Sequence, residues 1–169
     1  MYFTFGSMMP ISLEYIRETA AIWSEAVHQT GCRAIFQLPL QDLSAFLADD
    51  WVFKVQRAPY KKLVPRCSLV VHHGGGGTTQ SALLAGRPAI IVAHLSDQFF
   101  WGAELERLGV AGKTLKRKGL KSGKLAAGIA RVLASPNLAS AASALGQRMA
   151  AENGVATAID LIERHLGGR

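Results

Sequence analysis

The chain of 169 residues has few cysteines and no long apolar run, and each shortage argues against a class of protein. The two cysteines, Cys32 and Cys67, stand in apolar, strand-like surroundings without CxxC spacing. We therefore expect reduced core thiols rather than a disulfide framework or a cysteine-based metal site. No apolar stretch reaches the roughly 18 residues of a spanning helix, and no basic-then-apolar signal pattern opens the chain. These shortages predict a soluble, cytoplasmic protein.

Acidic residues are also scarce, numbering 12 against 19 lysines and arginines. The resulting positive charge suits a solvated surface, a phosphate-bearing ligand or an anionic membrane surface. The one dense basic stretch, from Lys113 to Lys124, has no interleaved aromatic residues, so nucleic acid is not predicted as a partner. We interpret this stretch as a solvated face, with peripheral contact to a membrane as the alternative.

Short β-favouring runs alternate with helical patterns along the chain. This rhythm predicts an α/β fold: a Rossmann-like, doubly wound parallel sheet of about six strands in a single domain, residues 1–169, with a helical C-terminal tail. The expected strands are 2–5, 33–38, 51–55, 68–72, 89–93 and 110–112. The expected helices are 10–29, 78–86, 98–108 and those from 120 onward, broken at 135–137 and 153–154, with a short turn or helix at 42–47.

The stretch from Val70 to Thr79 passes from β-branched residues through two histidines and four glycines into a helical pattern. Glycines let the backbone approach a phosphate closely, and the free N–H groups of the following helix face the charge. The stretch is not a Walker A loop and does not fit Gly-x-Gly-x-x-Gly, so NAD is disfavoured. Adjacent strand residues point to opposite faces, which disfavours a metal site formed by His72 and His73 together. We expect His72 to be packed and His73 to reach the ligand.

Other turns with polar side chains or glycine follow neighbouring strands. They are Gly6-Ser7, Arg57-Ala58 and Asp97-Gln98. In doubly wound sheets, ligands bind at the carboxyl ends of the strands, near the point where the strand order reverses. The sequence therefore predicts one site at this edge, although Asp97 also fits the simpler role of a helix cap.

Five segments stand in the order and spacing of family 1 glycosyltransferases of the GT-B fold. They are 5–8, 58–59, 70–79, 85–88 and 97–102. The chain most closely resembles the C-terminal half of the bacterial and fungal sterol, glycolipid and antibiotic glucosyltransferases. In that family this half binds the nucleotide-sugar donor, while the N-terminal half binds the acceptor and carries the catalytic histidine base. The resemblance covers the whole chain and implies that the base and the acceptor domain lie outside it.

The resemblance also implies a role for single residues, each in contact with one part of the donor. Arg57 and Ala58 match the place of the uracil ring, and Asp97 and Gln98 match the pair that holds the hexose hydroxyls. Arg57 departs from the tryptophan of the plant branch, and its guanidinium plane can stack on a base. The residues matched to the diphosphate are Gly6, Ser7, His73, Gly75, Gly76, Gly77 and Thr78.

The resemblance thus implies the donor domain of an inverting, metal-independent glycosyltransferase that needs no cofactor. The implied donor is a UDP-sugar, UDP-glucose in particular, and the implied acceptor is a lipid, a sterol or another small hydrophobic molecule. Alone, the domain should bind donor weakly and turn over nothing, because half a cleft cannot exclude water or orient an acceptor. One alternative is a natural nucleotide-sugar-binding subunit that acts with a separate acceptor-domain chain. A further alternative is a fragment of a dinucleotide-binding oxidoreductase.

Overall fold

The computed structural model describes residues 1–8, 12–39 and 49–166, and its centre is one six-stranded parallel sheet. The strand order is β3-β2-β1-β4-β5-β6, so the chain builds outward from β1 to β3 and then returns to β4 on the other side of β1. The predicted doubly wound α/β fold is confirmed. The strands are β1 Tyr2–Thr4, β2 Ala34–Gln37, β3 Val52–Val55, β4 Val70–His72, β5 Ala89–Ala93 and β6 Leu115–Lys116.

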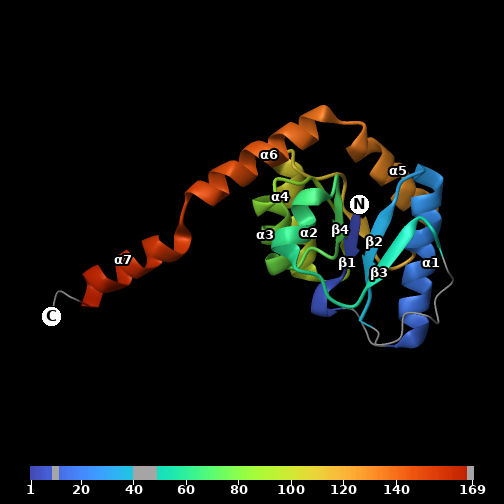
Figure 1. Cartoon of the computed structure of the whole chain (residues 1–169), viewed down its shortest axis with the longest axis horizontal. Helices are drawn as coiled ribbons and strands as arrows, with labels where there is room; N and C mark the ends of the chain where they lie inside the picture. The colour runs from blue at the N-terminus through green and yellow to red at the C-terminus, as the bar shows by residue number, and fades with distance from the viewer. Residues whose placement is uncertain (9–11, 40–48, 167–169) are drawn as a thin grey trace.

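Helices cover both faces of the sheet (Figure 1). Helices α1 (Leu13–Thr30) and α5 (Ser122–Leu133) pack together on one face. The other face carries α2 (Tyr60–Leu63), α3 (Gly76–Leu84) and α4 (Ser96–Arg107), and α6 (Pro136–Ala151) packs over α3. Two short 3-10 helices, η1 (Gly6–Met8) and η2 (Val64–Arg66), follow β1 and α2.

The core follows the alternation of side chains along each strand. On the α1 face, Trp23 packs against the rings of Phe3, Phe5 and Phe36, with centroids 5.4, 4.8 and 5.3 Å away. Every residue of β5 is buried, as expected of a strand covered on both faces. The apolar face of α1 is buried from Ile16 onward, whereas Leu13, the first residue of the helix, is 43% exposed.

Several element boundaries differ from the sequence expectation, among them those of α3, α4 and β6. Helix α3 begins at Gly76 rather than at Thr78, because glycine backbone near its start is free to turn. Helix α4 begins at Ser96 rather than at Gln98, because the Gln98 side chain caps the turn before it. The predicted strand 110–112 is wrong: Ala111 makes only a single bridge to Ala89, and β6 forms instead where Leu115 pairs with Val92. The predictions for Pro10 and for 42–47 lie outside the described residues.

The tail is helical as predicted, and its last helix, α7 (Gly154–Leu166), projects away from the sheet (Figure 1). The predicted breaks are confirmed: Ser135 caps α6 by accepting a hydrogen bond from the Leu138 N–H, and Asn153 adopts a positive φ before α7. No residue of α7 is buried. Within the residues placed by the structure, no helix has the length and apolar character needed to cross a membrane.

Candidate functional site

The candidate site lies where β1 and β4, the two strands at the reversal of strand order, reach their carboxyl ends. Gly6 follows β1 with a φ of +58°, a conformation that favours glycine. A Cβ on Gly6 would lie 3.1 Å from His73 Cε1 and 3.6 Å from Thr78 Oγ1. The structure therefore brings Gly6, His73 and Thr78 together, as the sequence predicted for this edge.

The imidazole of His73 lies between two glycines. A Cβ on Gly75 would lie only 2.2 Å from His73 Nε2, so no larger residue fits beside the ring as it stands. His73 is 4% exposed, and its buried Nδ1 has no hydrogen-bond partner among the described residues. Burial lowers the pKa of His73, and the nearby Asp97 carboxylate opposes that shift. A neutral imidazole with an unpartnered nitrogen is thus fixed at the site.

His72, its neighbour in sequence, has a different environment. It is completely buried, and its Nδ1 accepts a hydrogen bond of 3.1 Å from the Gly74 N–H. Burial, with a smaller effect of His73, lowers the pKa of His72 to about 3, so the ring is neutral. The prediction that His72 is a packed, hydrogen-bonded histidine is therefore confirmed. Its bond to Gly74 also holds the loop that follows.

The N-terminus of α3 points unpaired backbone donors at the site. The first helical hydrogen bond runs from the Thr79 N–H to the Gly75 carbonyl at 2.9 Å, and no side chain caps the helix. The N–H groups of Gly76, Gly77 and Thr78 consequently have no acceptor within the helix. A Cβ on Gly77 would meet nothing within 4 Å, which leaves open space beside these donors. Helix N-termini of this kind attract anions.

Close packing joins this loop to the start of α4. Gly74 has a φ of +92°, and a Cβ there would lie 2.8 Å from Ile91 Cγ2 and 3.0 Å from the Gln98 carbonyl oxygen. Only glycine fits this approach. The glycine loop and the Asp97-Gln98 pair are therefore neighbours, as the sequence predicted.

Asp97 and Gln98 differ in exposure and in partners. Gln98 is 2% exposed, and its Oε1 accepts hydrogen bonds from the N–H groups of His94 at 2.7 Å and Leu95 at 3.3 Å. It therefore caps the N-terminus of α4. Asp97 is exposed in the first turn of the same helix. The cap predicted as a role for Asp97 is thus supplied by Gln98, and contact of either residue with a hexose stays a prediction.

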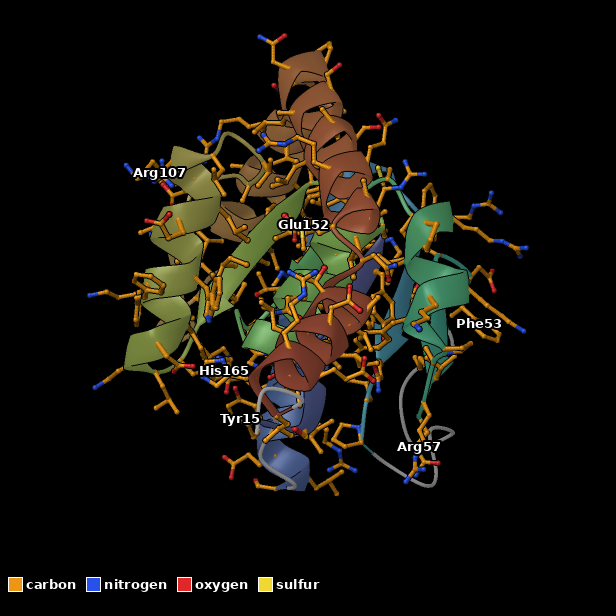
Figure 2. The ribbon with its side chains drawn as sticks, turned by 90° about the vertical axis from the view of Figure 1, so that its left-hand side faces the viewer. Tyr15, Phe53, Arg57, Arg107, Glu152 and His165 are labelled. Atoms are coloured by element: carbon orange, nitrogen blue, oxygen red, sulfur yellow. The ribbon has the colours of Figure 1, made fainter. Side chains whose placement is uncertain are left out.

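Arg57 and Ala58 follow β3 at the same end of the molecule, where Figure 2 also shows Tyr15. A hydrogen-bond network links this segment to Gly6. The Tyr60 hydroxyl lies 3.0 Å from Gln37 Oε1 and 3.2 Å from Thr4 Oγ1, and Thr4 Oγ1 accepts a hydrogen bond of 2.9 Å from the Gly6 N–H. Gln37 and Tyr60 were missed by the sequence analysis, because only the folded strands show that they meet.

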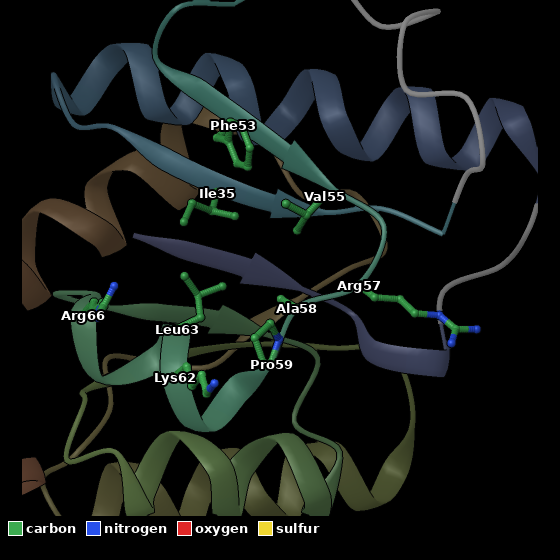
Figure 3. A pocket seen from close by; sticks show the side chains of 9 residues that line it. All are labelled: Ile35, Phe53, Val55, Arg57, Ala58, Pro59, Lys62, Leu63 and Arg66. Carbon is green, nitrogen blue, oxygen red and sulfur yellow. The ribbon is translucent and has the colours of Figure 1, made fainter.

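An apolar hollow of about 260 Å³ lies beside this segment, between α2 and strands β2 and β3. Figure 3 shows the Arg57 side chain pointing away from the hollow, past the other residues that line it. Neither Gly6 nor His73 lines the hollow, which is therefore a different surface from the edge where those two residues meet. Ser7 is exposed at that edge.

A second pair that the sequence analysis missed is Tyr15 and His94. Tyr15 lies in the first turn of α1, and His94 follows β5, yet the Tyr15 hydroxyl is 2.6 Å from His94 Nε2. Nothing in the sequence pattern pairs two residues so far apart along the chain. Among the described residues there is no group of three His, Cys, Asp or Glu side chains placed to hold a metal ion.

Comparison with known proteins gives relatives that are glycosyltransferases. A sterol 3-beta-glucosyltransferase of Arabidopsis thaliana is 35% identical over 168 residues, covering 98% of this chain and 27% of the plant protein. The O-mycaminosyltylonolide 6-deoxyallosyltransferase of Streptomyces fradiae is 41% identical over 110 residues, covering 65% of this chain and 26% of that protein. The chain thus spans about a quarter of the length of either relative.

Solved structures share the fold. The glycosyltransferase VinC, solved in complex with dTDP, matches with a TM-score of 0.77 at 25% identity, over 96% of this chain and 41% of VinC. The glycosyltransferase of kitacinnamycin matches with a TM-score of 0.80 at 21% identity, over 96% of this chain and 42% of that one. The family model of the erythromycin biosynthesis protein CIII-like C-terminal domain matches residues 33–163. The chain therefore belongs to this family of glycosyltransferase C-terminal domains.

Proposed function

We propose that this chain binds the diphosphate of a nucleotide-sugar donor, with a UDP-sugar as the donor and UDP-glucose as the specific case. The observation that carries the proposal is the unpartnered, buried His73 imidazole beside the free N–H groups at the N-terminus of α3. Neutral donors and a helix dipole suit a dianion, which gains about 0.3 to 2 kcal/mol from the dipole. Charge-assisted hydrogen bonds add about 1.5 to 3 kcal/mol each.

The proposed reaction is an inverting, metal-independent transfer in which this chain stabilises the departing diphosphate. Negative charge builds on the leaving oxygen as the bond to the sugar breaks, and the N–H groups of Gly76, Gly77 and Thr78 would meet it without reorganising. The base that deprotonates the acceptor hydroxyl belongs to a separate acceptor domain in this proposal. No cofactor is proposed, and the acceptor would be a lipid, a sterol or another small hydrophobic molecule.

An acceptor domain, in the same chain or in another, is the proposed partner. The limited coverage of the relatives supports this proposal, since this chain spans about a quarter of each. The amphipathic helix α7 supports it as well, because its apolar side chains have no cover in the structure. The exposed ones are Val155, Ile159, Leu161, Ile162 and Leu166.

We also propose a cytoplasmic location and peripheral contact with a membrane. The free thiols of Cys32 and Cys67 are compatible with a reducing compartment. The basic stretch 113–124 offers five exposed lysines for anionic lipid, whereas Arg117 within it is only 7% exposed and pairs with Glu18. Sedimentation with vesicles of phosphatidylcholine, with and without phosphatidylglycerol, tests the contact.

Calorimetric titration of the chain with UDP, TDP and NAD tests the proposed ligand. We expect binding of UDP, with His73→Ala weakening it roughly tenfold or more because a charge-assisted hydrogen bond is lost. His72→Ala is the matched control, since it removes the neighbouring imidazole and should mainly lower the free energy of unfolding. Binding of NAD without a response to UDP contradicts the proposal, and preference for TDP contradicts the choice of base.

A further inference from the structure

The hydrogen bond between Tyr15 and His94 joins the start of α1 to the segment that carries Asp97. His94 Nδ1 lies 3.1 Å from the Val92 carbonyl oxygen, and Nε2 lies 2.6 Å from the Tyr15 hydroxyl. A carbonyl can only accept, so Nδ1 carries the proton and Nε2 accepts from the hydroxyl. The Phe5 ring packs against the imidazole with centroids 4.6 Å apart. The orientation and the tautomer of His94 are thereby fixed.

Tyr15 is held in turn from its other side. The guanidinium of Arg117 lies over the Tyr15 ring, 4.6 Å from its centroid. The Arg117 side chain donates to Glu18 at 3.0 Å and to Thr19 at 3.1 Å, both on α1. The Arg117 backbone N–H donates to the Ala93 carbonyl at 2.9 Å. Arg117, which directly follows β6, thus connects α1 to the end of β5.

The segment 94–98 is locked between these contacts and the cap of α4. Gln98 Oε1 accepts from the His94 N–H, so the residue that meets Tyr15 is also the residue that Gln98 holds. Asp97 is exposed, and its carboxylate makes no hydrogen bond with any residue in the described part of the chain. The position of this carboxylate therefore depends on the backbone of 94–98 rather than on a partner of its own.

We propose that Tyr15 and His94 are positioning residues that set the place of the Asp97 carboxylate for the sugar of the donor. The inference rests on the proposed function, because it concerns the sugar end of the same ligand. Tyr15 and His94 would not touch the nucleotide. Their loss should therefore weaken the sugar contact and leave the contacts of the diphosphate, at Gly6 and the N-terminus of α3, as they are.

The test compares the affinities of the whole chain for UDP and for UDP-glucose by calorimetry. Tyr15→Phe removes one hydroxyl and keeps the ring beneath Arg117. We expect the ratio of the UDP-glucose to the UDP association constant to fall roughly two- to tenfold, the equivalent of one net hydrogen bond. The UDP constant itself should change less than about twofold. In an Asp97→Ala background, Tyr15→Phe should cause no further fall.

Ser24→Ala is the matched control, because Ser24 lies on the same helix and its hydroxyl donates to Asp49 at 2.6 Å, away from His94. It should leave the ratio unchanged. An unchanged ratio in Tyr15→Phe, an equal loss for both ligands, or a full effect in the Asp97→Ala background overturns the inference. A wild-type ratio of one also overturns it, since there is then no sugar contact to position. Failure of the wild-type chain to bind UDP contradicts the proposed function instead.

Discussion

Two loops at the same edge of the sheet are held in place by different kinds of contact. The glycine loop 73–75 after β4 is fixed mainly by close packing, with Gly75 against the His73 ring and Gly74 against Ile91 and Gln98, besides the bond from the Gly74 N–H to His72. The segment 94–98 after β5 is fixed by hydrogen bonds, with Gln98 Oε1 accepting from the His94 N–H and the Tyr15 hydroxyl donating to His94 Nε2. Adding a methyl group to a glycine should therefore destabilise the glycine loop, whereas removing a hydrogen-bonding side chain should destabilise the segment 94–98.

Acid should weaken both loops, and we expect this to be the largest effect. Burial lowers the pKa of His72 to about 3 and that of His94 to about 4, below the 6.5 of an unfolded chain. As the pH falls below 6.5, the unfolded state binds protons that the folded state does not, so the free energy of unfolding decreases. Each histidine should contribute about 1.4 kcal/mol per pH unit down to its folded pKa. Urea denaturation between pH 7 and pH 4.5 measures the slope.

The variant His94→Gln separates the contribution of His94 to the pH dependence from that of His72. Glutamine does not titrate, so the slope should fall by the share of one histidine and the share of His72 should remain. The titratable and charged groups near His94 are Tyr15, Arg117 and His73. Burial is the main cause of the low pKa of His94, and the positive charge of Arg117 lowers this pKa further. A slope that is the same in wild type and His94→Gln would show that His94 is not held neutral by the fold.

Adding a methyl group to the glycine loop should have the next largest effect. In Gly75→Ala the new Cβ would lie 2.2 Å from His73 Nε2, so the ring or the backbone must move. We expect a loss of about 1 to 3 kcal/mol in the free energy of unfolding, typical of overpacking, together with weaker binding of UDP. Urea denaturation and calorimetry measure the two effects.

Gly77→Ala is the matched control for stability. A Cβ there meets nothing within 4 Å, and alanine is favoured over glycine in a helix by up to about 1 kcal/mol. The free energy of unfolding should therefore stay the same or rise. Equal losses in Gly75→Ala and Gly77→Ala would mean that close packing against His73 does not hold this loop.

Removing the cap of α4 should have the smallest effect of the three. Gln98→Ala leaves the N–H groups of His94 and Leu95 without their acceptor, which lowers the free energy of unfolding by about 1 to 2 kcal/mol. Glu104→Ala on the same helix removes an exposed ion pair with Arg107 and should change stability little. If both variants behaved alike, the segment 94–98 would not depend on the Gln98 side chain.

Much of the site could be predicted because its signals are local in the sequence. Glycines between a β-branched run and a helical pattern predicted the loop after β4, and the structure places Gly6, His73, Gly75 and Thr78 together there. The strand 110–112 was predicted wrongly for the same reason. Its apolar residues are typical of a strand, but only Ala111 bridges β5, and the ladder of paired residues forms further on, at Leu115 and Lys116.

The sequence by itself determined the alternation of strands and helices, the parallel sheet and the position of the glycine loop, since these depend on hydrophobic period and on backbone freedom over a few residues. Only the tertiary structure decided that Gln98 rather than Asp97 caps α4, and that Tyr15 meets His94. The cap is a local choice between two side chains of one helical turn, whereas Tyr15 and His94 lie 79 residues apart along the chain and meet only when the sheet has assembled.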